Sequence, residues 1–187
     1  LTSDVLYAFT SCEIYISTNS CVIYSGKPQF LSVHELLRIS TANTLELLRG
    51  ELQIRKNDLL EQLHFASLEK IFIEKRIYRR IEECETWQEV IDTIDKGLKP
   101  HIRHFIREVT TDDIIRLTEI RIKRISKYNS FKADEEIKRL QDELSEVQGH
   151  LDNLVEYAID YFRRIQKKYG KGRERCTEIR NFDVIEA

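Results

Sequence analysis

One sequence feature limits the fold more than any other: apolar residues recur with alternating gaps of four and three between residues 140 and 165. Charged and polar residues fill most of the positions between them, so the apolar stripe is narrow. A narrow stripe with a seven-residue repeat is typical of a helix that pairs with one other helix. The pattern therefore predicts a rod, as one helix from about Lys132 to Tyr169. The positions of this seam are Leu140, Leu144, Val147, Leu151, Leu154, Ala158, Tyr161 and Ile165.

A second long helix is predicted earlier in the chain. Ser32 and Glu35 have the spacing of a capping box, in which the serine caps the Glu35 backbone N–H and the glutamate reaches back. A helical pattern follows, from Ser32 to about Ile81. Because a compact helical segment separates the two long helices, we expect them to fold back on each other, antiparallel, with that segment at the tip. Gly149 is predicted to mark a bend in the returning helix.

The segment between the long helices is predicted to hold several short helices. Thr86 and Glu89 have capping-box spacing, and the helix that they open is expected to end at Gly97. Another helix is predicted to begin near Thr110, because acidic residues follow that suit the positive end of a helix. The apolar side of this helix forms either the core of its own segment or an exposed patch that contacts a second copy. Its members are Ile114, Leu117, Ile120 and Ile125.

Both chain ends contain β-prone residues, with strands predicted at Tyr7–Thr10, Cys12–Ser17 and Cys21–Tyr24 and a final strand near the C-terminus. The predicted fold class is therefore mainly α: a long antiparallel coiled coil, a small helical domain at its tip, and short strands from both ends at its base. The predicted parts are 1–31 (strands), 32–84 (outgoing helix), 85–149 (helical region at the tip), 150–169 (return helix) and 170–187 (return strand).

Composition excludes several function classes. A charged fraction of 33% with only 6 glycines and 2 prolines favours long helices, and a net charge of −2 supplies no overall attraction to nucleic acid. The four cysteines form no CxxC pair, which indicates free thiols in a reducing cytosol. No segment is apolar enough for a membrane span. The chain begins at Leu1 and contains no methionine, so we interpret it as a piece of a longer protein.

Few residues suggest chemistry. His101 and His104 lie about one helical turn apart, but no further ligand pattern accompanies them, so no metal site is predicted. Neither a glycine-rich phosphate loop nor a GxSxG turn is present. The strongest basic patch lies between residues 163 and 175. It is either a solvated helix end or a surface that contacts DNA phosphates. Its candidate DNA contacts are Arg164, Lys167, Lys168, Lys171 and Arg173.

Several blocks resemble bacterial type IIA DNA topoisomerase A subunits, the family that includes the A subunits of topoisomerase IV and of gyrase. One such block is Lys168–Arg175 together with Thr177–Ile179, which is similar to the segment where the family's chain comes out of its coiled coil. A second block, Leu117–Ile125, is similar to the family's dimer-gate helix. Leu6–Pro28 resembles the end of the family's tower domain, and His64–Phe72 resembles its outgoing stalk helix. Cys176 stands where the family pattern favours a basic residue.

The resemblance implies that the chain is the end of the tower, the coiled-coil stalk and the exit gate (C-gate) of a type II topoisomerase. Such an enzyme passes one DNA duplex through another at the expense of ATP, which changes supercoiling and decatenates DNA. The family's nucleophilic tyrosine lies upstream of the matched region, so this chain is expected to hold no catalytic residue and to be inactive alone. The resemblance further implies that the helical region 85–149 is the C-gate dimerisation domain. The implied dimer contacts are Ile114, Leu117, Ile120, Arg121 and Ile125.

Cofactors and partners follow from the same resemblance. Mg and ATP are expected to act through the partner subunit, with no cofactor bound here. The implied partners are a second copy of the chain, double-stranded DNA and the topoisomerase B subunit, with no membrane, in the cytoplasm and associated with the chromosome. Two alternatives from other classes stay open: a non-enzymatic coiled-coil dimerisation scaffold and a stand-alone DNA-binding module.

Overall fold

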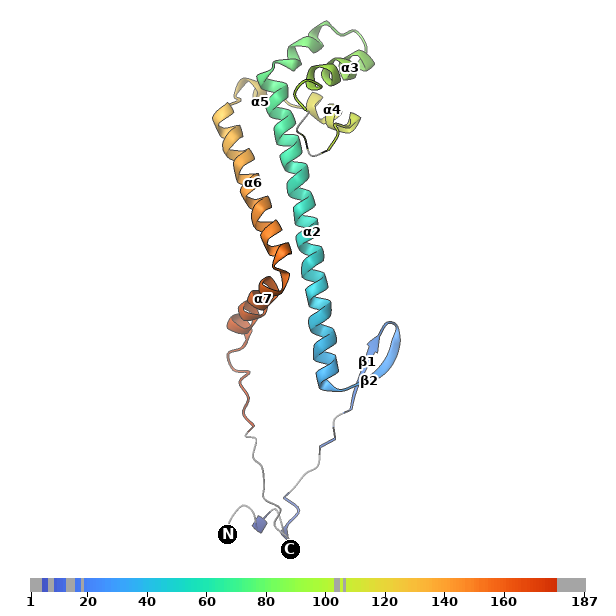
Figure 1. Ribbon diagram of the computed structural model, residues 1–187, viewed down its shortest axis with the longest axis vertical. Helices are drawn as coiled ribbons and strands as arrows, with labels where there is room; N and C mark the ends of the chain where they lie inside the picture. The colour runs from blue at the N-terminus through green and yellow to red at the C-terminus, as the bar shows by residue number, and fades with distance from the viewer. Residues whose placement is uncertain are drawn as a thin grey trace. The chain divides into compact units, whose positions relative to one another are not determined.

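The computed structural model describes residues 5–6, 9–12, 16–17, 19–102, 105 and 107–177 (Figure 1). These residues are mainly helical, as predicted, with one small antiparallel sheet near the N-terminus. The chain divides into two compact units: the first comprises Leu1–Leu47 with Tyr157–Ala187, and the second comprises Leu48–Glu156. The elements are β1 (Ser20–Tyr24), β2 (Lys27–Leu31), α2 (Val33–Glu74), the 3₁₀ helix η1 (Ile77–Glu83), α3 (Trp87–Leu98), α4 (Thr111–Thr118), α5 (Ile122–Ser126), α6 (Ser130–Asp152) and α7 (Leu154–Tyr169).

The sheet is a hairpin in which Ser20 lies opposite Leu31 and Tyr24 lies opposite Lys27. Its turn uses two residues with positive φ, Ser25 at 52° and Gly26 at 75°, the geometry that matches the twist of paired strands. The strand predicted at Cys21–Tyr24 is confirmed, and a turn at Ser25–Pro28 was also expected from the sequence. The partner strand Lys27–Leu31, which follows this turn, was not predicted.

The earliest predicted strands are wrong where the structure describes them. In the predicted strand Tyr7–Thr10, Phe9 is helical and the Thr10 N–H donates to the Leu6 carbonyl at 3.0 Å, a helical spacing. In Cys12–Ser17, Cys12 lies in a turn and residues 16 and 17 have no strand assignment. The other positions of both segments, and the predicted final strand beyond residue 177, lie outside the described residues. Strand propensity depends strongly on a partner strand, so it is a weak predictor here.

Helix α2 begins as predicted but ends before the predicted Ile81. At its start, the Ser32 N–H donates to Glu35 Oε2 at 2.9 Å and the Glu35 N–H donates to Ser32 Oγ at 3.3 Å, which confirms the capping box. After Glu74, Arg76 takes a left-handed conformation (φ 54°), and the chain continues as η1. The turn brings Ile77 into the core of the second unit, and this burial outweighs the helical propensity of the sequence.

The return helix is broken in two. The predicted single helix from Lys132 to Tyr169 is instead α6 and α7, separated at Asn153 (φ −117°, ψ 46°). The Asn153 N–H and its side-chain amide both donate to the Gly149 carbonyl at 3.1 Å. Gly149 itself is helical, so the break lies four residues after the predicted bend. The asparagine amide competes with the helical hydrogen bonds at this point, which the heptad pattern does not reveal.

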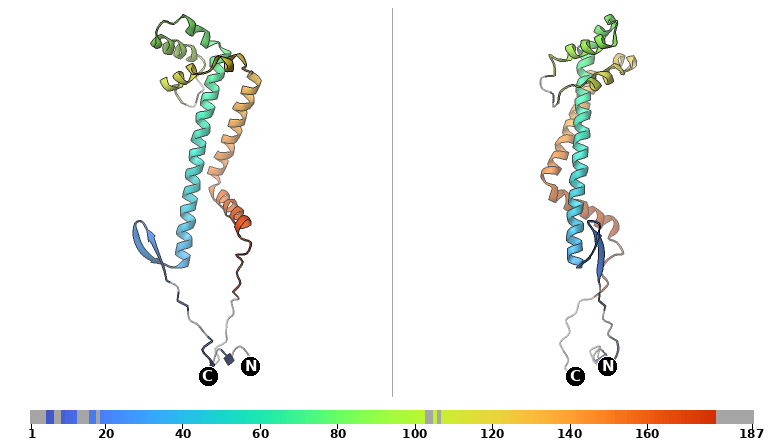
Figure 2. Two further views of the ribbon diagram at one scale, coloured as in Figure 1. Left: turned by 180° about the vertical axis from the view of Figure 1, so that it is seen from behind. Right: turned by 90° about the vertical axis from the view of Figure 1, so that its right-hand side faces the viewer.

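Within the second unit, α2 and α6 pack against each other in opposite directions. Leu59 and Leu63 of α2 form a buried cluster with Leu140 of α6. Arg55 pairs with Glu143 at 2.8 Å and Lys70 pairs with Asp134, so positions rise along α2 as they fall along α6. The two ribbons run side by side in all three side views (Figures 1 and 2).

The burial of the seam varies along its length. Leu140, Leu154 and Ala158 are buried, Leu144, Val147, Leu151 and Tyr161 are half-buried, and Ile165 is exposed. Coiled-coil packing along the whole seam therefore stays a prediction, as does the five-part division of the chain.

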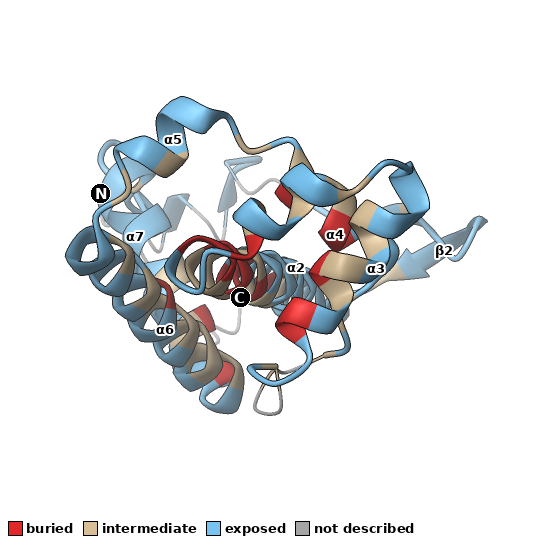
Figure 3. Ribbon diagram, turned by 90° about the horizontal axis from the view of Figure 1, so that it is seen from above, coloured by how far each residue is buried: buried red, intermediate tan, exposed pale blue. Residues whose placement is uncertain are grey.

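The main core of the second unit lies where α2 meets η1, α3 and α4. In Figure 3 red segments, which mark buried residues, lie on α2 and on parts of α3 and α4, and others lie on α6. Gly97 of α3 allows close contact, because a Cβ at this position would lie 2.9 Å from Ile77 Cγ2. Any side chain at position 97 would therefore push α3 and η1 apart. The buried members of this core are Leu68, Phe72, Ile73, Ile77, Ile94, Leu98, Ile114 and Leu117.

Candidate functional site

The predicted gate helix is two helices, not one. The α4 capping box is formed by Thr110 and Asp113, and the helix ends at Thr118. Arg121 then has an extended backbone (φ −63°, ψ 138°) before α5 begins at Ile122. The single-helix prediction over residues 110–125 is therefore wrong. The chain changes direction between Thr118 and Ile122, and this change lets both α4 and α5 place apolar side chains on the same core.

The change of direction between α4 and α5 determines which side chains are available for contact with a second copy of the chain. Ile114 and Leu117 are 4% and 1% exposed and belong to the core of the second unit. Ile120 and Ile125 are half-buried against the same core, whereas Arg121 is exposed. For Ile114 and Leu117 the structure therefore favours the core over the exposed patch, the two alternatives that the sequence left open.

The most exposed large apolar side chain of this segment is one that the sequence prediction missed. Ile122, the first residue of α5, is 83% exposed. The sequence prediction placed Ile114, Leu117, Ile120 and Ile125 on the apolar side of this segment and did not single out Ile122. Scattered exposed apolar residues are common, but this one lies on a five-residue helix flanked by cations at Arg121 and Lys123.

Arg107 joins two parts of the second unit that are distant in sequence. Its Nε and Nη2 donate to the two carboxylate oxygens of Glu61 on α2 at 2.9 and 2.8 Å. Its Nη1 and Nη2 donate to the two oxygens of Asp113 on α4 at 2.6 and 3.0 Å. Two bidentate carboxylate contacts on one guanidinium form a rigid, planar clasp. The clasp ties the segment before α4 to the side of α2.

Asp113 is the buried member of this clasp, at 2% exposure. It also accepts hydrogen bonds from the Thr110 N–H at 3.0 Å and the Thr110 hydroxyl at 2.9 Å. Burial alone would raise the pKa of the Asp113 carboxyl, but the hydrogen bonds from Arg107 and Thr110 outweigh it and hold the pKa well below its usual range. Asp113 is therefore ionised at neutral pH.

His64 of α2 lies beside the clasp. Its Nε2 is 3.4 Å from Asp113 Oδ2, and its ring meets the Phe105 ring edge-on at 5.3 Å between centroids. Neither ring nitrogen has a hydrogen-bond partner among the described residues. Burial, together with the nearby Arg107 charge, lowers the pKa of His64 despite the neighbouring carboxylate. The imidazole is therefore neutral near pH 7.

The predicted DNA-contact residues belong to the first unit. Arg164, Lys167 and Lys168 lie near the end of α7, and Lys171 and Arg173 follow it; all five are exposed. Lys168 Nζ lies 5.0 Å above the Tyr169 ring. Within the described part of the chain, none of the five cations forms an ion pair. This arrangement is compatible with both a solvated helix end and contact with phosphates, so the DNA role stays a proposal.

Metal and redox chemistry find little support in the described ranges. Across them, no three His, Cys, Asp or Glu residues are grouped closely enough to hold a metal ion. His101 is exposed, and His104 lies outside the described residues. All four cysteines are free thiols. None of the described helices combines the length and the apolar character needed to cross a bilayer.

Comparison with known proteins identifies the family: residues 1–163 match the model of the DNA gyrase/topoisomerase IV A subunits, and the chain belongs to this family. It is similar to the A subunit of DNA topoisomerase 4 from Borreliella burgdorferi, with 30% identity over 176 residues. That alignment covers 94% of this chain and 28% of the relative, so the chain spans little more than a quarter of that protein. The family prediction is confirmed.

Proposed function

We propose that this chain is the stalk and exit gate (C-gate) of a bacterial type II DNA topoisomerase A subunit. The observation that carries the proposal is the architecture of the second unit. Two antiparallel helices, α2 and α6, are joined by a helical segment with its own core, and α5 exposes Ile122 beside that core. The stalk keeps the gate segment in place, and the gate closes by contact with a second copy.

The burial of individual side chains supports a narrower choice of residues for this proposed contact. A gate must open in each cycle, so its interface has to be separable from the core that holds each half together. Ile114 and Leu117 are core residues, whereas Arg121, Ile122 and the partly exposed Ile120 and Ile125 remain available at the surface. We assign Ile122 as the apolar centre of the gate contact. A single exposed side chain at the centre of a small interface is compatible with reversible association.

Replacing Ile122 by glutamate is expected to weaken self-association of the 187-residue chain by at least about tenfold, because a carboxylate would be desolvated at a symmetric contact. Sedimentation equilibrium over a concentration series measures the dissociation constant. Ile54→Glu is the matched control, because Ile54 is 65% exposed on α2 in the same unit. A wild-type chain that stays monomeric at high micromolar concentration, or equal weakening by both variants, would refute the gate assignment.

The basic residues at the end of α7 are proposed to contact the DNA backbone. Reversing three charges, Lys167→Glu, Lys171→Glu and Arg173→Glu, is expected to weaken duplex binding and to reduce its dependence on salt concentration. Each phosphate that the variant no longer neutralises should lower the slope of log K against log salt by about one. Fluorescence anisotropy with a labelled duplex at several salt concentrations measures both effects. An unchanged slope of log K against log salt would show that this segment does not contact the DNA phosphates.

The larger activity belongs to the whole protein. We propose ATP-dependent passage of one duplex through another, with the catalytic tyrosine outside this chain and with ATP and Mg handled by a B subunit. In this scheme the chain binds no cofactor and is inactive alone. The coding sequence upstream distinguishes this function from a coiled-coil scaffold, because only the topoisomerase requires a winged-helix segment with an arginine–tyrosine pair.

A further inference from the structure

A concave basic surface lies in the second unit, apart from the α7 segment already proposed to contact DNA. It is a cavity of about 780 Å³ between α2, α6 and the α4–α5 segment. Its apolar lining includes Phe65, Ala66 and Ile120, and most of its other lining residues are charged. Seven basic residues line it against three acidic ones, in a chain whose net charge is −2. Such a concentration of positive charge is not explained by overall composition.

Two of the seven cations are used in structural ion pairs. Arg124 pairs with Glu69 at 2.5 Å between Nε and Oε1, and Lys70 pairs with Asp134. Among the residues that the structure describes, the other five form no ion pair. These five, called the cation row below, are Arg116, Arg121, Lys123, Lys127 and Lys132.

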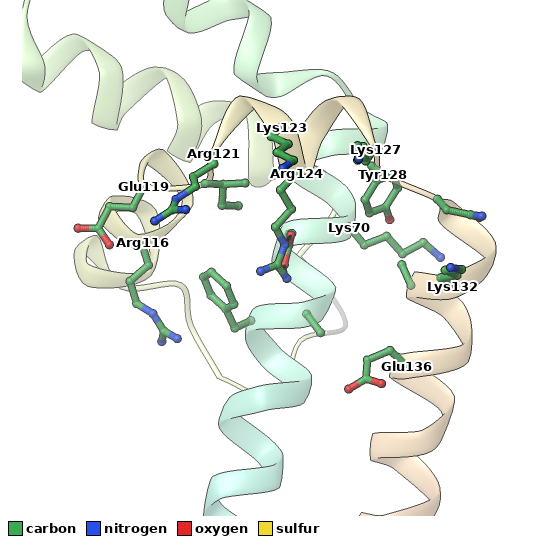
Figure 4. Close-up of a pocket in the computed structure, with 16 residues that line it drawn as sticks. Lys70, Arg116, Glu119, Arg121, Lys123, Arg124, Lys127, Tyr128, Lys132 and Glu136 are labelled. Carbon is green, nitrogen blue, oxygen red and sulfur yellow. Dashed lines mark hydrogen bonds and ion pairs between the residues drawn. The ribbon is translucent and has the colours of Figure 1, made fainter.

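The cation row lies along one rim of the cavity. Figure 4 shows Arg116 and Arg121 at one end, Lys123 near the middle and Lys127 and Lys132 toward α6. Arg116 is held in place by Phe65, since its guanidinium carbon lies 4.2 Å above the centre of the ring. The row therefore combines two guanidinium groups, one of them stacked on an aromatic ring, with three ammonium groups that line the same cavity.

Like charges at this density repel each other in the free protein, and the repulsion is relieved when a multivalent anion enters. A monovalent anion or a single carboxylate would neutralise only one or two members of the row. Linear phosphate chains carry closely spaced charges and accept hydrogen bonds from both arginine and lysine.

We propose that the cation row is a binding site for closely spaced phosphate groups, supplied either by a nucleic-acid backbone or by a free oligophosphate. The site goes beyond the proposed gate function, because the row lies within one copy of the chain; Ile120 and Arg121 belong to both surfaces, whereas Lys123 and Lys127 were not assigned to the gate contact. It is also distinct from the basic end of α7, which belongs to the first unit.

The test uses the 187-residue chain and two probes, inorganic tripolyphosphate and a short DNA duplex. The site variant is Lys123→Glu with Lys127→Glu, since neither side chain makes an ion pair within the described residues. The matched control is Lys75→Glu with Lys138→Glu, which changes the net charge equally at exposed positions of the same unit outside the cavity. Titration calorimetry follows tripolyphosphate, and anisotropy follows the duplex.

The site variant is expected to lose about tenfold or more in affinity for at least one probe, and the control less than about twofold. Lost duplex affinity assigns the phosphates to nucleic acid, whereas lost tripolyphosphate affinity alone assigns them to a free oligophosphate. Equal losses in both variants, or no loss in the site variant, would overturn the proposal. Lys123→Gln with Lys127→Gln should give a smaller loss in the same direction, and unchanged circular dichroism confirms folding. Self-association is measured separately, so failure of this site leaves the gate assignment intact.

Discussion

Replacing Arg107 by alanine is expected to destabilise the second unit by about 3 kcal/mol. The guanidinium is the shared partner of Glu61 and Asp113, and Asp113 is 2% exposed. Without Arg107, the buried carboxylate keeps only the Thr110 hydrogen bonds and loses its compensating charge. Glu61 is largely solvated, so most of the loss comes from the Asp113 side.

Urea unfolding followed by circular dichroism measures this loss. Arg139→Ala is the matched control, because Arg139 also contacts two carboxylates, Glu136 and Glu143, but on the exposed surface of α6. Its effect should stay within about 0.5 kcal/mol. Similar losses of unfolding free energy in both variants would show that burial of Asp113 does not increase the stabilising effect of the clasp.

The clasp also predicts the sign of the acid response. The folded pKa of Asp113 is depressed, so its contribution to stability is complete above the unfolded value of about 4 and is lost as pH falls below it. The wild-type chain should therefore lose stability between about pH 5 and pH 2. The Arg107→Ala variant should show a shallower loss over this range, because its folded Asp113 pKa lies closer to the unfolded value.

Leu117→Asp is expected to unfold the second unit, with a loss of about 4 kcal/mol or more. Leu117 is 1% exposed within the main core, so an aspartate there would bury a carboxylate with no cation to pair with. Thermal unfolding by circular dichroism measures the effect. Leu117→Met conserves the volume and should cost less than about 1.5 kcal/mol.

Comparison with Ile122→Glu separates a core residue from an interface residue. Ile122→Glu should keep the wild-type melting temperature and lose association, because the side chain is solvated in the single chain. If Leu117→Asp instead kept its melting temperature and lost only association, then Leu117 would be a contact between copies, and the core assignment would be wrong.

The parts of the fold that local chemistry determines could be predicted from the sequence. Ser32 and Thr86 begin their helices through capping boxes, and the structure shows both. Such motifs involve a side chain and a backbone group three residues apart, so the sequence contains the whole interaction. The mainly helical class followed from the two long periodic segments.

The helix ends and the clasp could not be predicted in the same way. Arg76 takes a left-handed conformation without being glycine or asparagine, because core burial of Ile77 determines the turn. Arg107 and Glu61 are 46 positions apart, and no periodic pattern links them. A signal for Asp113 was present in the Thr110 spacing, which is that of a capping box with aspartate in place of glutamate. Its charge partner became visible only in the folded chain.

The break at Asn153 gives the two arms different mechanical properties. Helix α2 runs without interruption from Val33 to Glu74, and every turn is held by the next through backbone hydrogen bonds. The return arm lacks this continuity at Asn153, where α6 ends and α7 begins. An axial load on the pair would therefore be carried mainly by α2, while the return arm could bend at one defined joint. A pair in which one helix is continuous and the other is interrupted can transmit an axial force and still tolerate a change in the angle between α6 and α7.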